Sequence, residues 1–325
     1  FCSGGERERI EEHMPWIEEF HPIPIMEERG LIEAFVSGTL KRVFSERGLE
    51  RARVGLDTVH SAQLEAYRRH LPQVEFANGD VPMQRARLIK FPEEIALLEE
   101  AAALGDALTR RALDGVRAGR RECELAGDAM QTLYYLGGEF QMTLSPFVGS
   151  GEHLSPPMRY ATDKIIREGD LVFVDIGAVW NGYFNDVGRT TICGRPTREQ
   201  KRVYRAVYEC LEVCKEAMGP GVTNDQVAEA MLQSAESHGL RERFISLFIG
   251  HGIGMSGNEP PYIGETLPGA ETVELKPGMV FAVEPLIWLP GIEGGGGVRL
   301  EDTILITETG CRALNRLDFE ERLLD

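Results

Sequence analysis

Four carboxylates and one imidazole could together do chemistry, and each lies in or ends a segment whose other residues are largely apolar: Asp175, Asp186, His251, Glu284 and Glu301. A carboxylate buried in such a segment is costly unless it is paired or binds a cation. Two divalent ions would bring about four positive charges, which four carboxylates balance while a neutral imidazole adds a ligand. Two such ions roughly 3.5–4 Å apart can share a hydroxide and make it nucleophilic. Taken singly, each residue could instead be structural.

The two aspartates are expected in one β-hairpin. The stretch from 172 to 191 contains two segments rich in β-branched and aromatic residues, joined at Asn181-Gly182, which is a strong hairpin signal. Two carboxylates that face each other in this hairpin would repel, and a divalent cation between them relieves that repulsion. Alone, the pair could also be one surface aspartate and one capping aspartate.

The other three candidates belong to strand-like runs further along the chain. His251 follows the apolar run 244–250, while Glu284 lies within 279–289 and Glu301 within 297–307. Apolar residues at helical spacing predict helices before and between these runs, over 92–116, 123–136, 197–218 and 223–238.

The first part of the chain has few candidate catalytic residues and a mixed α/β pattern. We predict a helix over 35–48, a strand over 53–57, a helix over 61–70 and a strand followed by a turn within 72–80. A boundary near 87–92 divides the chain into domains at 1–88 and 89–325. Because the chain begins at Phe1 without a signal-like segment, we expect the first domain to be incomplete.

Charge and cysteine content restrict the partners. A net charge of −17 argues against nucleic acid and against an anionic membrane surface. No uninterrupted apolar run approaches the ~18 residues of a membrane span. The six cysteines form no CxxC pair, which favours reduced thiols and a cytoplasmic location. We therefore expect neither nucleic acid nor a membrane as partner.

Four motifs occur in a meaningful order: D-x-G-x4-G-Y-x2-D at 175–186, G-H-G-I-G at 250–254, V-E-P at 283–285 and R-L-E-D-T at 299–303. In this order they resemble the pita-bread metallopeptidases, which include aminopeptidase P, prolidase, methionine aminopeptidase and the non-peptidase creatinase. The resemblance extends over most of 90–310. It implies an α+β fold with a pita-bread catalytic domain, preceded by a smaller N-terminal α/β domain of which residues 1–88 would be a part.

The resemblance also implies roles for the five candidates. They would ligate two divalent metal ions, with Asp186 and Glu301 bridging the ions and Glu284 doubling as the proton shuttle. We expect Mn²⁺, with Fe, Co and Zn also compatible with such ligands. The implied activity is hydrolysis of an amide C–N bond in a small-molecule or short-peptide substrate, by an enzyme like Xaa-Pro dipeptidase or aminopeptidase that acts as a homodimer.

The peptidases of this family carry three substrate-holding histidines, and here these positions are Arg159, Leu247 and Asn258. Asn258 can donate a hydrogen bond to a developing oxyanion but cannot transfer a proton. Arg159 could clamp a substrate carboxylate or pair with a surface acid. His153 could substitute locally or simply be exposed, and Tyr183 could line the pocket or pack in the core. These changes keep a second candidate open, a relative like creatinase, ectoine hydrolase or the DMSP lyases that acts on a small solute.

Overall fold

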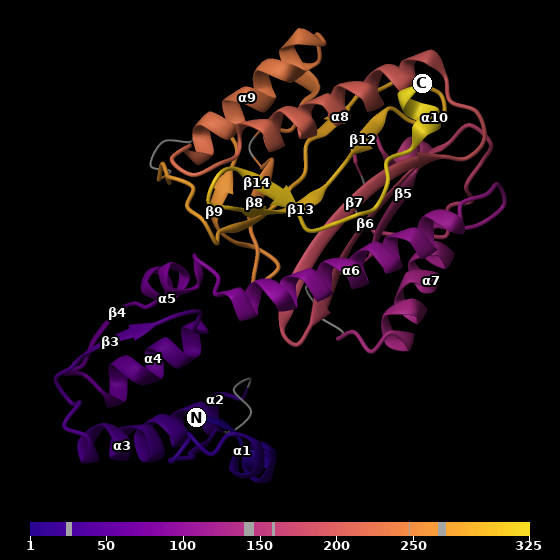
Figure 1. Ribbon diagram of the computed structural model, residues 1–325. Helices are drawn as coiled ribbons and strands as arrows, with labels where there is room; N and C mark the ends of the chain where they lie inside the picture. Colours follow the sequence, from indigo (N-terminus) through magenta and orange to yellow (C-terminus); the bar gives the residue numbers. More distant parts are fainter. Residues whose placement is uncertain (24–27, 140–145, 158–159, 247, 266–270) are drawn as a thin grey trace. The chain divides into compact units, whose positions relative to one another are not determined.

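The computed structural model describes residues 1–23, 28–139, 146–157, 160–246, 248–265 and 271–325. Contacts divide the chain into two compact units, Phe1–Arg85 and Ala86–Asp325 (Figure 1). This division falls close to the domain boundary that we place between 88 and 89. Assigning the first unit to the N-terminal domain of the family stays a prediction.

The first unit is a small α/β body with its own apolar cluster. Its elements are β1 (Cys2–Ser3), η1 (Gly4–Glu6), α1 (Arg7–His13), β2 (Pro22–Ile23), α2 (Arg29–Ala34), η2 (Phe35–Leu40), α3 (Lys41–Glu46), β3 (Arg53–Leu56), α4 (Ser61–His70) and β4 (Glu75–Asn78). Helix α4 forms where it was predicted, and β3 and β4 pair in parallel. The predicted helix over 35–48 is part of a longer helical stretch that begins at Arg29 and includes a π-helical turn. We did not predict α5 (Asp80–Arg87), which carries Pro82 near its start, where a proline is tolerated.

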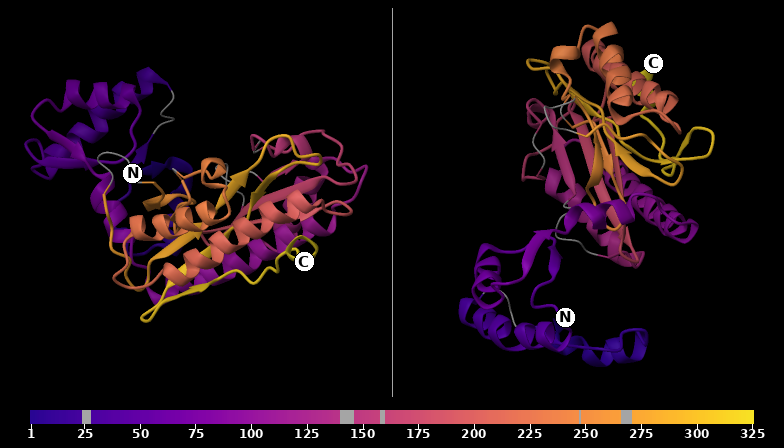
Figure 2. Two further views of the ribbon diagram at one scale, coloured as in Figure 1. Left: turned by 90° about the horizontal axis from the view of Figure 1, so that it is seen from above. Right: turned by 90° about the vertical axis from the view of Figure 1, so that its left-hand side faces the viewer.

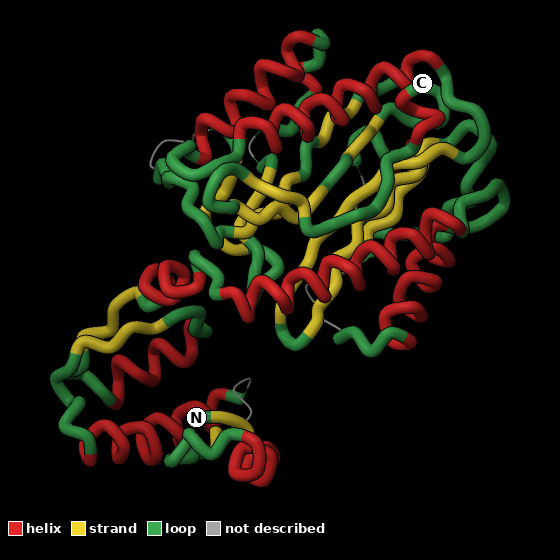
Figure 3. Tube along the Cα trace, viewed as in Figure 1, coloured by secondary structure: helices red, strands yellow, loops and turns green. Residues whose placement is uncertain are grey.

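The second unit contains the candidate residues. Its elements are α6 (Pro92–Asp114), α7 (Glu122–Tyr135), β5 (Phe147–Ser150), η3 (Gly151–His153), β6 (Leu171–Trp180), β7 (Tyr183–Ile192), α8 (Arg198–Ala217), α9 (Asn224–Ser237), η4 (Arg241–Arg243), β8 (Gly250–Gly252), β9 (Glu259–Ile263), β10 (Val280–Val283), β11 (Leu286–Trp288), β12 (Gly297–Arg299), β13 (Asp302–Ile306), β14 (Cys311–Ala313) and α10 (Glu321–Leu324). The four long helices match the predicted ranges to within a few residues at their ends. Helices form the outer layers of this unit and strands its interior (Figure 3).

The predicted hairpin is the longest strand pair in the described chain. Asn181 and Gly182 both have positive φ, 47° and 79°, as a type I′ turn requires, and they join β6 to β7. Alternate residues of β6 point to opposite faces. Val172, Val174 and Ile176 pack with the apolar residues of α6 and α7, while the neighbouring odd-numbered residues face the opposite side.

The second sheet has the strand order β14-β13-β10-β8-β9, and its apolar side packs with α8 and α9. In Figure 1, α8 and α9 lie on one side of the strands and α6 and α7 on the other, and Figure 2 shows the same unit from two further directions. The strands therefore bring together segments that are far apart in the sequence.

The sequence overstated the length of three strands in this sheet. Among the described residues of the apolar run 244–250, only Gly250 belongs to a named strand, β8, although Phe244 and Ile249 are buried. The predicted strand 279–289 breaks at Glu284-Pro285, where proline lacks an N–H for the ladder. The predicted strand 297–307 breaks before Asp302. Two candidate carboxylates, Glu284 and Glu301, thus lie at strand ends.

Within the described ranges, the structure contains no helix with the length and apolar character needed to cross a membrane.

Candidate metal centre

The register of the hairpin places both aspartates on one face. Asp175 pairs with Gly188, and Gly177 pairs with Asp186. Residues two apart on a strand share a face, so the two carboxylates are diagonal neighbours, and each has a glycine directly opposite. Because glycine has no side chain, these two positions leave room between the aspartates.

The second sheet presents the remaining candidates in the same way. Strand β8 pairs with β10 through His251 and Ala282, so His251 shares a face with the residue two positions after Ala282, which is Glu284. The last pair of β10 with β13 is Val283 with Asp302, so Glu284 and Glu301 are the adjoining residues beyond that pair. One imidazole and two carboxylates therefore lie on one face.

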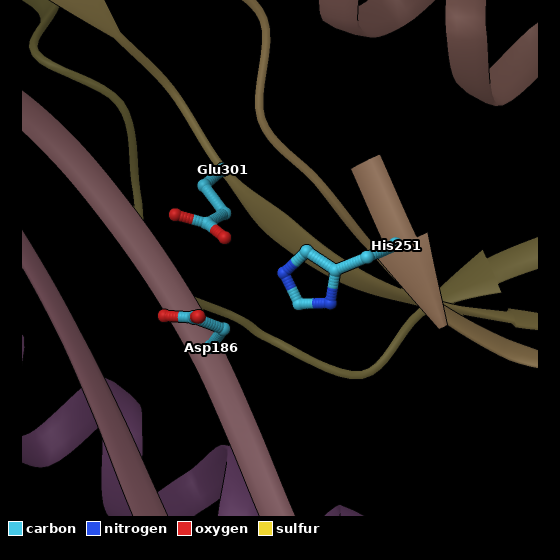
Figure 4. A group of neighbouring side chains, drawn as sticks. All are labelled: Asp186, His251 and Glu301. Carbon is cyan, nitrogen blue, oxygen red and sulfur yellow. The ribbon is translucent and has the colours of Figure 1, made fainter. Parts of the chain in front are cut away.

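Side chains from the two sheets meet in one cluster. Asp186, His251 and Glu301 point toward one another (Figure 4), and each offers a ligand atom within 4.8 Å of the others. The Arg299 Nη1 atom contacts the remaining two candidates, at 2.7 Å from Asp175 Oδ2 and 2.8 Å from Glu284 Oε2. The Nε2 atom of His251 lies 3.6 Å from Glu284 Oε1. The structure thus brings together all five candidates.

The backbone around His251 fixes the orientation of its ring. A Cβ at Gly250 would lie 2.6 Å from the carbonyl oxygen of Ala282, and one at Gly252 would lie 2.8 Å from that of Glu259, so glycine alone fits on both sides. His251 Nδ1 lies 2.9 Å from the Gly252 carbonyl oxygen, which leaves Nε2 with a free lone pair. Burial lowers the pKa of His251, which keeps the ring neutral and able to ligate.

The electrostatics of the cluster fit a divalent cation. Burial, together with the negative charges of Asp175 and the other neighbouring carboxylates, raises the pKa of both Asp186 and Glu301 well above the ordinary value. Asp186 Oδ1 and Glu301 Oε2 are buried atoms without a hydrogen-bond partner in the described part of the chain. Buried acceptors of this kind are costly unless they are satisfied. A cation would satisfy both oxygens and relieve the repulsion between the carboxylates.

Arg299 is a member of this site that we did not single out from the sequence. It lies two residues before Glu301, in β12, and its side chain is only 11% exposed. Nearby carboxylates raise its pKa despite the opposing effect of burial. An arginine two residues before a candidate ligand was the signal available in the sequence, but the motif alone reveals neither its burial nor its partners.

The structure does not bring the predicted substrate residues together as it does the five candidate ligands. Asn258 is exposed and directly precedes β9. His153 Nδ1 lies 3.1 Å from both carboxylate oxygens of the buried Glu122, so that nitrogen contacts the protein itself. Arg159 and Leu247 lie outside the described residues.

Tyr183 is not directed toward the cluster. Tyr183 lies three positions before Asp186 on the same strand, and residues an odd number of positions apart leave opposite faces of β7. The Tyr183 hydroxyl donates to Glu94 Oε1 at 2.9 Å. Burial and the Glu94 carboxylate raise the pKa of Tyr183 to about 12.

An apolar cavity of about 130 Å³ adjoins the cluster through Arg299. It is lined by Leu154, Pro157, Phe173, Ile245, Phe248, Leu286, Gly297 and Arg299. The Phe248 ring also stacks on His251, with a centroid distance of 5.4 Å. A small apolar group could therefore lie beside the cluster.

Known proteins are similar to this chain in sequence and in fold. The model of metallopeptidase family M24 matches residues 96–308. The Xaa-Pro dipeptidase of Pyrococcus furiosus is 34% identical over 263 residues, which are 81% of this chain and 73% of that protein. The probable dipeptidase PepE of Mycobacterium tuberculosis is 35% identical over 240 residues, 73% of this chain and 61% of that protein. The structure of the prolidase from Pyrococcus horikoshii OT3 superposes with a TM-score of 0.81 at 27% identity, covering 98% of this chain and 85% of that one.

The fold and the converging carboxylates therefore define a metal-dependent hydrolase with the pita-bread fold. The match extends over most of the second unit, and the chain belongs to metallopeptidase family M24. Enzymes of this family use divalent metals, generally two.

Proposed function

We propose that this protein hydrolyses the peptide bond of Xaa-Pro dipeptides or of short peptides with an Xaa-Pro start. The observation that carries the proposal is the convergence of four carboxylates and one neutral imidazole, two of whose carboxylate oxygens are buried without a partner. The names of the similar proteins, Xaa-Pro dipeptidase and prolidase, support the choice of substrate.

We assign five ligands to two divalent ions: Asp175, Asp186, His251, Glu284 and Glu301. Asp186 and Glu301 would bridge the ions, which agrees with their close approach from two sheets. When bound, the ions would act as Lewis acids and lower the pKa of water. We propose Mn²⁺ as the metal, and a cytoplasmic homodimer as the form of the protein.

The residues of the chain would handle the proton and the charge. Glu284 lies 2.8 Å from Arg299 and 3.6 Å from His251, so its carboxylate is held against the cluster. It would accept a proton from the attacking water at a carboxylate oxygen and deliver it to the leaving nitrogen. Asn258 would donate a hydrogen bond to the developing oxyanion, with Arg159 or His153 as further substrate contacts.

A second candidate keeps the same centre and changes the substrate to a small amide or guanidino solute. The replacement of three histidine positions by Arg159, Leu247 and Asn258 favours this alternative. Both candidates use all five ligands, so the substrate profile separates them.

The test is hydrolysis by Mn²⁺-reconstituted protein of Xaa-Pro dipeptides and of longer peptides that begin with Xaa-Pro. Dipeptides without proline serve as the substrate control, and Asp186→Ala serves as the enzyme control. Proline-dependent turnover that the variant loses supports the proposal. No turnover by protein that still binds about two metal ions per chain would overturn it and favour the small-solute alternative.

A further inference from the structure

Residues 313–319, which we call the C-terminal segment, contact the neighbours of both proposed bridging ligands, Asp186 and Glu301. This segment supplies no ligand itself. Two sets of buried polar contacts join it to β7 near Asp186 and to the residues around Glu301, and one set is centred on Arg189 and the other on Thr303.

Arg189 uses all of its guanidinium nitrogens. Nη1 donates to the carbonyl oxygens of Gly188 at 2.9 Å and Glu301 at 2.6 Å. Nη2 donates to Asp302 Oδ1 and to the Leu317 carbonyl oxygen, both at 2.7 Å, and Nε donates to the same Leu317 oxygen at 3.3 Å. The side chain is only 4% exposed. One planar cation thus fixes the backbone at Glu301 relative to β7 and to the C-terminal segment.

Thr303 forms the second set. Its hydroxyl donates to the Asp186 carbonyl oxygen at 2.8 Å and accepts a hydrogen bond from Asn185 Nδ2 at 2.8 Å. Asn315 Oδ1 accepts from the Thr303 backbone N–H at 2.9 Å. Asn315 Nδ2 donates in turn to Asp106 Oδ1 of α6 at 2.8 Å. The backbone of Asp186 is therefore joined to β13, to the C-terminal segment and to α6.

We propose that Arg189 and Thr303 are positioning residues, which together with the C-terminal segment fix the spacing between the carboxylates of Asp186 and Glu301. This inference rests on the proposed metal centre. The hydrogen bonds that Arg189 and Thr303 make to Asp186 and Glu301 go to the backbone of these ligands and not to their carboxylates. Hydrogen-bond partners that orient metal ligands typically change metal affinity by about 10–100-fold when removed.

The test compares metal affinity in four variants of the full chain. Arg189→Lys keeps the charge but not the planar array of donors. Thr303→Val removes the hydroxyl, and Thr303→Ser restores it. Arg322→Gln is the matched control, because Arg322 joins α10 to the far end of β7 through the carbonyl oxygens of Ile192 and Gly194, both at 3.2 Å.

Metal-free proteins are titrated with Mn²⁺ by calorimetry, and their melting temperatures are measured in parallel. We expect Arg189→Lys and Thr303→Val to weaken binding about tenfold or more. Thr303→Ser should bind almost as the natural protein does, and Arg322→Gln should lower the melting temperature without changing affinity.

Natural affinity in folded Arg189→Lys or Thr303→Val would overturn the inference, and so would an equal loss in Arg322→Gln. If Arg189→Lys fails to fold, the Thr303 pair decides. Failure of the proposed function gives a different result, since the natural protein would then bind Mn²⁺ without turnover of Xaa-Pro substrates. Failure of the metal centre itself would show as a natural protein that binds no metal ions or that keeps its affinity in Asp186→Ala.

Discussion

Gly188 and Glu301 form an antiparallel bridge that joins the hairpin to the residues before β13. The Gly188 N–H donates to the Glu301 carbonyl oxygen at 3.3 Å, and the Glu301 N–H donates back at 2.9 Å. Gly188 also lies opposite Asp175 in the hairpin. One glycine without a side chain therefore lies between two carboxylates that come from different sheets.

A methyl group at this glycine should disturb the metal centre. In Gly188→Ala, the new Cβ would lie 3.0 Å from Glu301 Oε2 and 3.1 Å from Glu301 Cβ, so the carboxylate must move. We expect Mn²⁺ affinity to fall by about tenfold, as it does when ligand orientation is lost. Calorimetric titration of metal-free protein measures this change.

Gly127→Ala is the matched control, because its new methyl group meets nothing within 4 Å on α7. It should leave metal affinity unchanged and raise stability by about 0.5–1 kcal/mol, because alanine favours a helix interior over glycine. Equal affinities in both glycine variants would contradict the role given to Gly188.

The metal-free protein should lose stability as the pH rises. Burial first, and then neighbouring negative charge, raises the pKa of Asp186 and Glu301 in the folded state. The folded state therefore binds these protons more tightly than the unfolded state does. This contribution to stability is full below the unfolded pKa of about 4, and it is lost as the pH rises through the raised pKa of the folded state. The measurement is thermal unfolding of EDTA-treated protein at several values between pH 5 and pH 8.

The double variant Asp186→Asn/Glu301→Gln removes both acids and should show a weaker dependence over the same pH range. Added Mn²⁺ should abolish or reverse the loss in the natural protein, because the metal requires the deprotonated ligands. A natural protein that gains stability relative to the double variant between pH 5 and pH 8 would refute this prediction.

Removing one partner of a buried ion pair should strongly destabilise the protein near the loop that follows His251. Lys90 Nζ lies 3.4 Å from Glu259 Oε2, and the two side chains are 3% and 4% exposed. Lys90→Met would leave a buried carboxylate without its main cation and should destabilise the fold by about 3–5 kcal/mol. Urea unfolding measures the effect.

Replacing both partners, as in Lys90→Met/Glu259→Leu, should restore most of that loss, because no unpaired charge remains. The exposed pair of Arg202 and Glu199, 3.0 Å apart, is the comparison. Arg202→Gln should cost less than about 1 kcal/mol. A double variant that is less stable than Lys90→Met would contradict this account.

Tyr183→Phe should separate stability from substrate binding. The variant loses the hydrogen bond to Glu94 at 2.9 Å and should be less stable by about 1 kcal/mol. Because the side chain leaves the face of β7 opposite Asp186, KM for the substrate should not change. Steady-state kinetics with Asn258→Ala alongside gives the contrast, since that variant should raise KM. A raised KM in Tyr183→Phe would instead make Tyr183 a substrate contact.

The sequence alone was enough to predict the hairpin and the long helices, for local reasons. Asn181-Gly182 supplies two residues that tolerate positive φ, so the turn is encoded where it forms. Periodic apolar residues predict α6 and α8 because a helix must bury one face. The five candidate ligands also came from the sequence, because a charged residue among apolar ones is conspicuous.

Strand limits near the candidate ligands were not predictable in the same way. The runs that hold Glu284 and Glu301 are rich in apolar residues, yet each breaks into two strands at the carboxylate. Pro285 is a local reason for the first break. At Glu301 no such local signal exists, and the pairing partners that decide where the strand ends lie in distant parts of the chain.

Only the tertiary structure decided which residues surround the ligands. Arg299 in β12 contacts Asp175 in β6 and Glu284 after β10. These three segments come together only in the folded unit. Arg189 binds the backbone of Glu301 and Leu317 across more than a hundred residues of sequence separation. The sequence by itself determined the types of the candidate ligands and the turn that pairs two of them, because these depend on neighbouring residues. The spacing of the carboxylates, and the cations that hold them, depend on packing between sheets, which no local pattern contains.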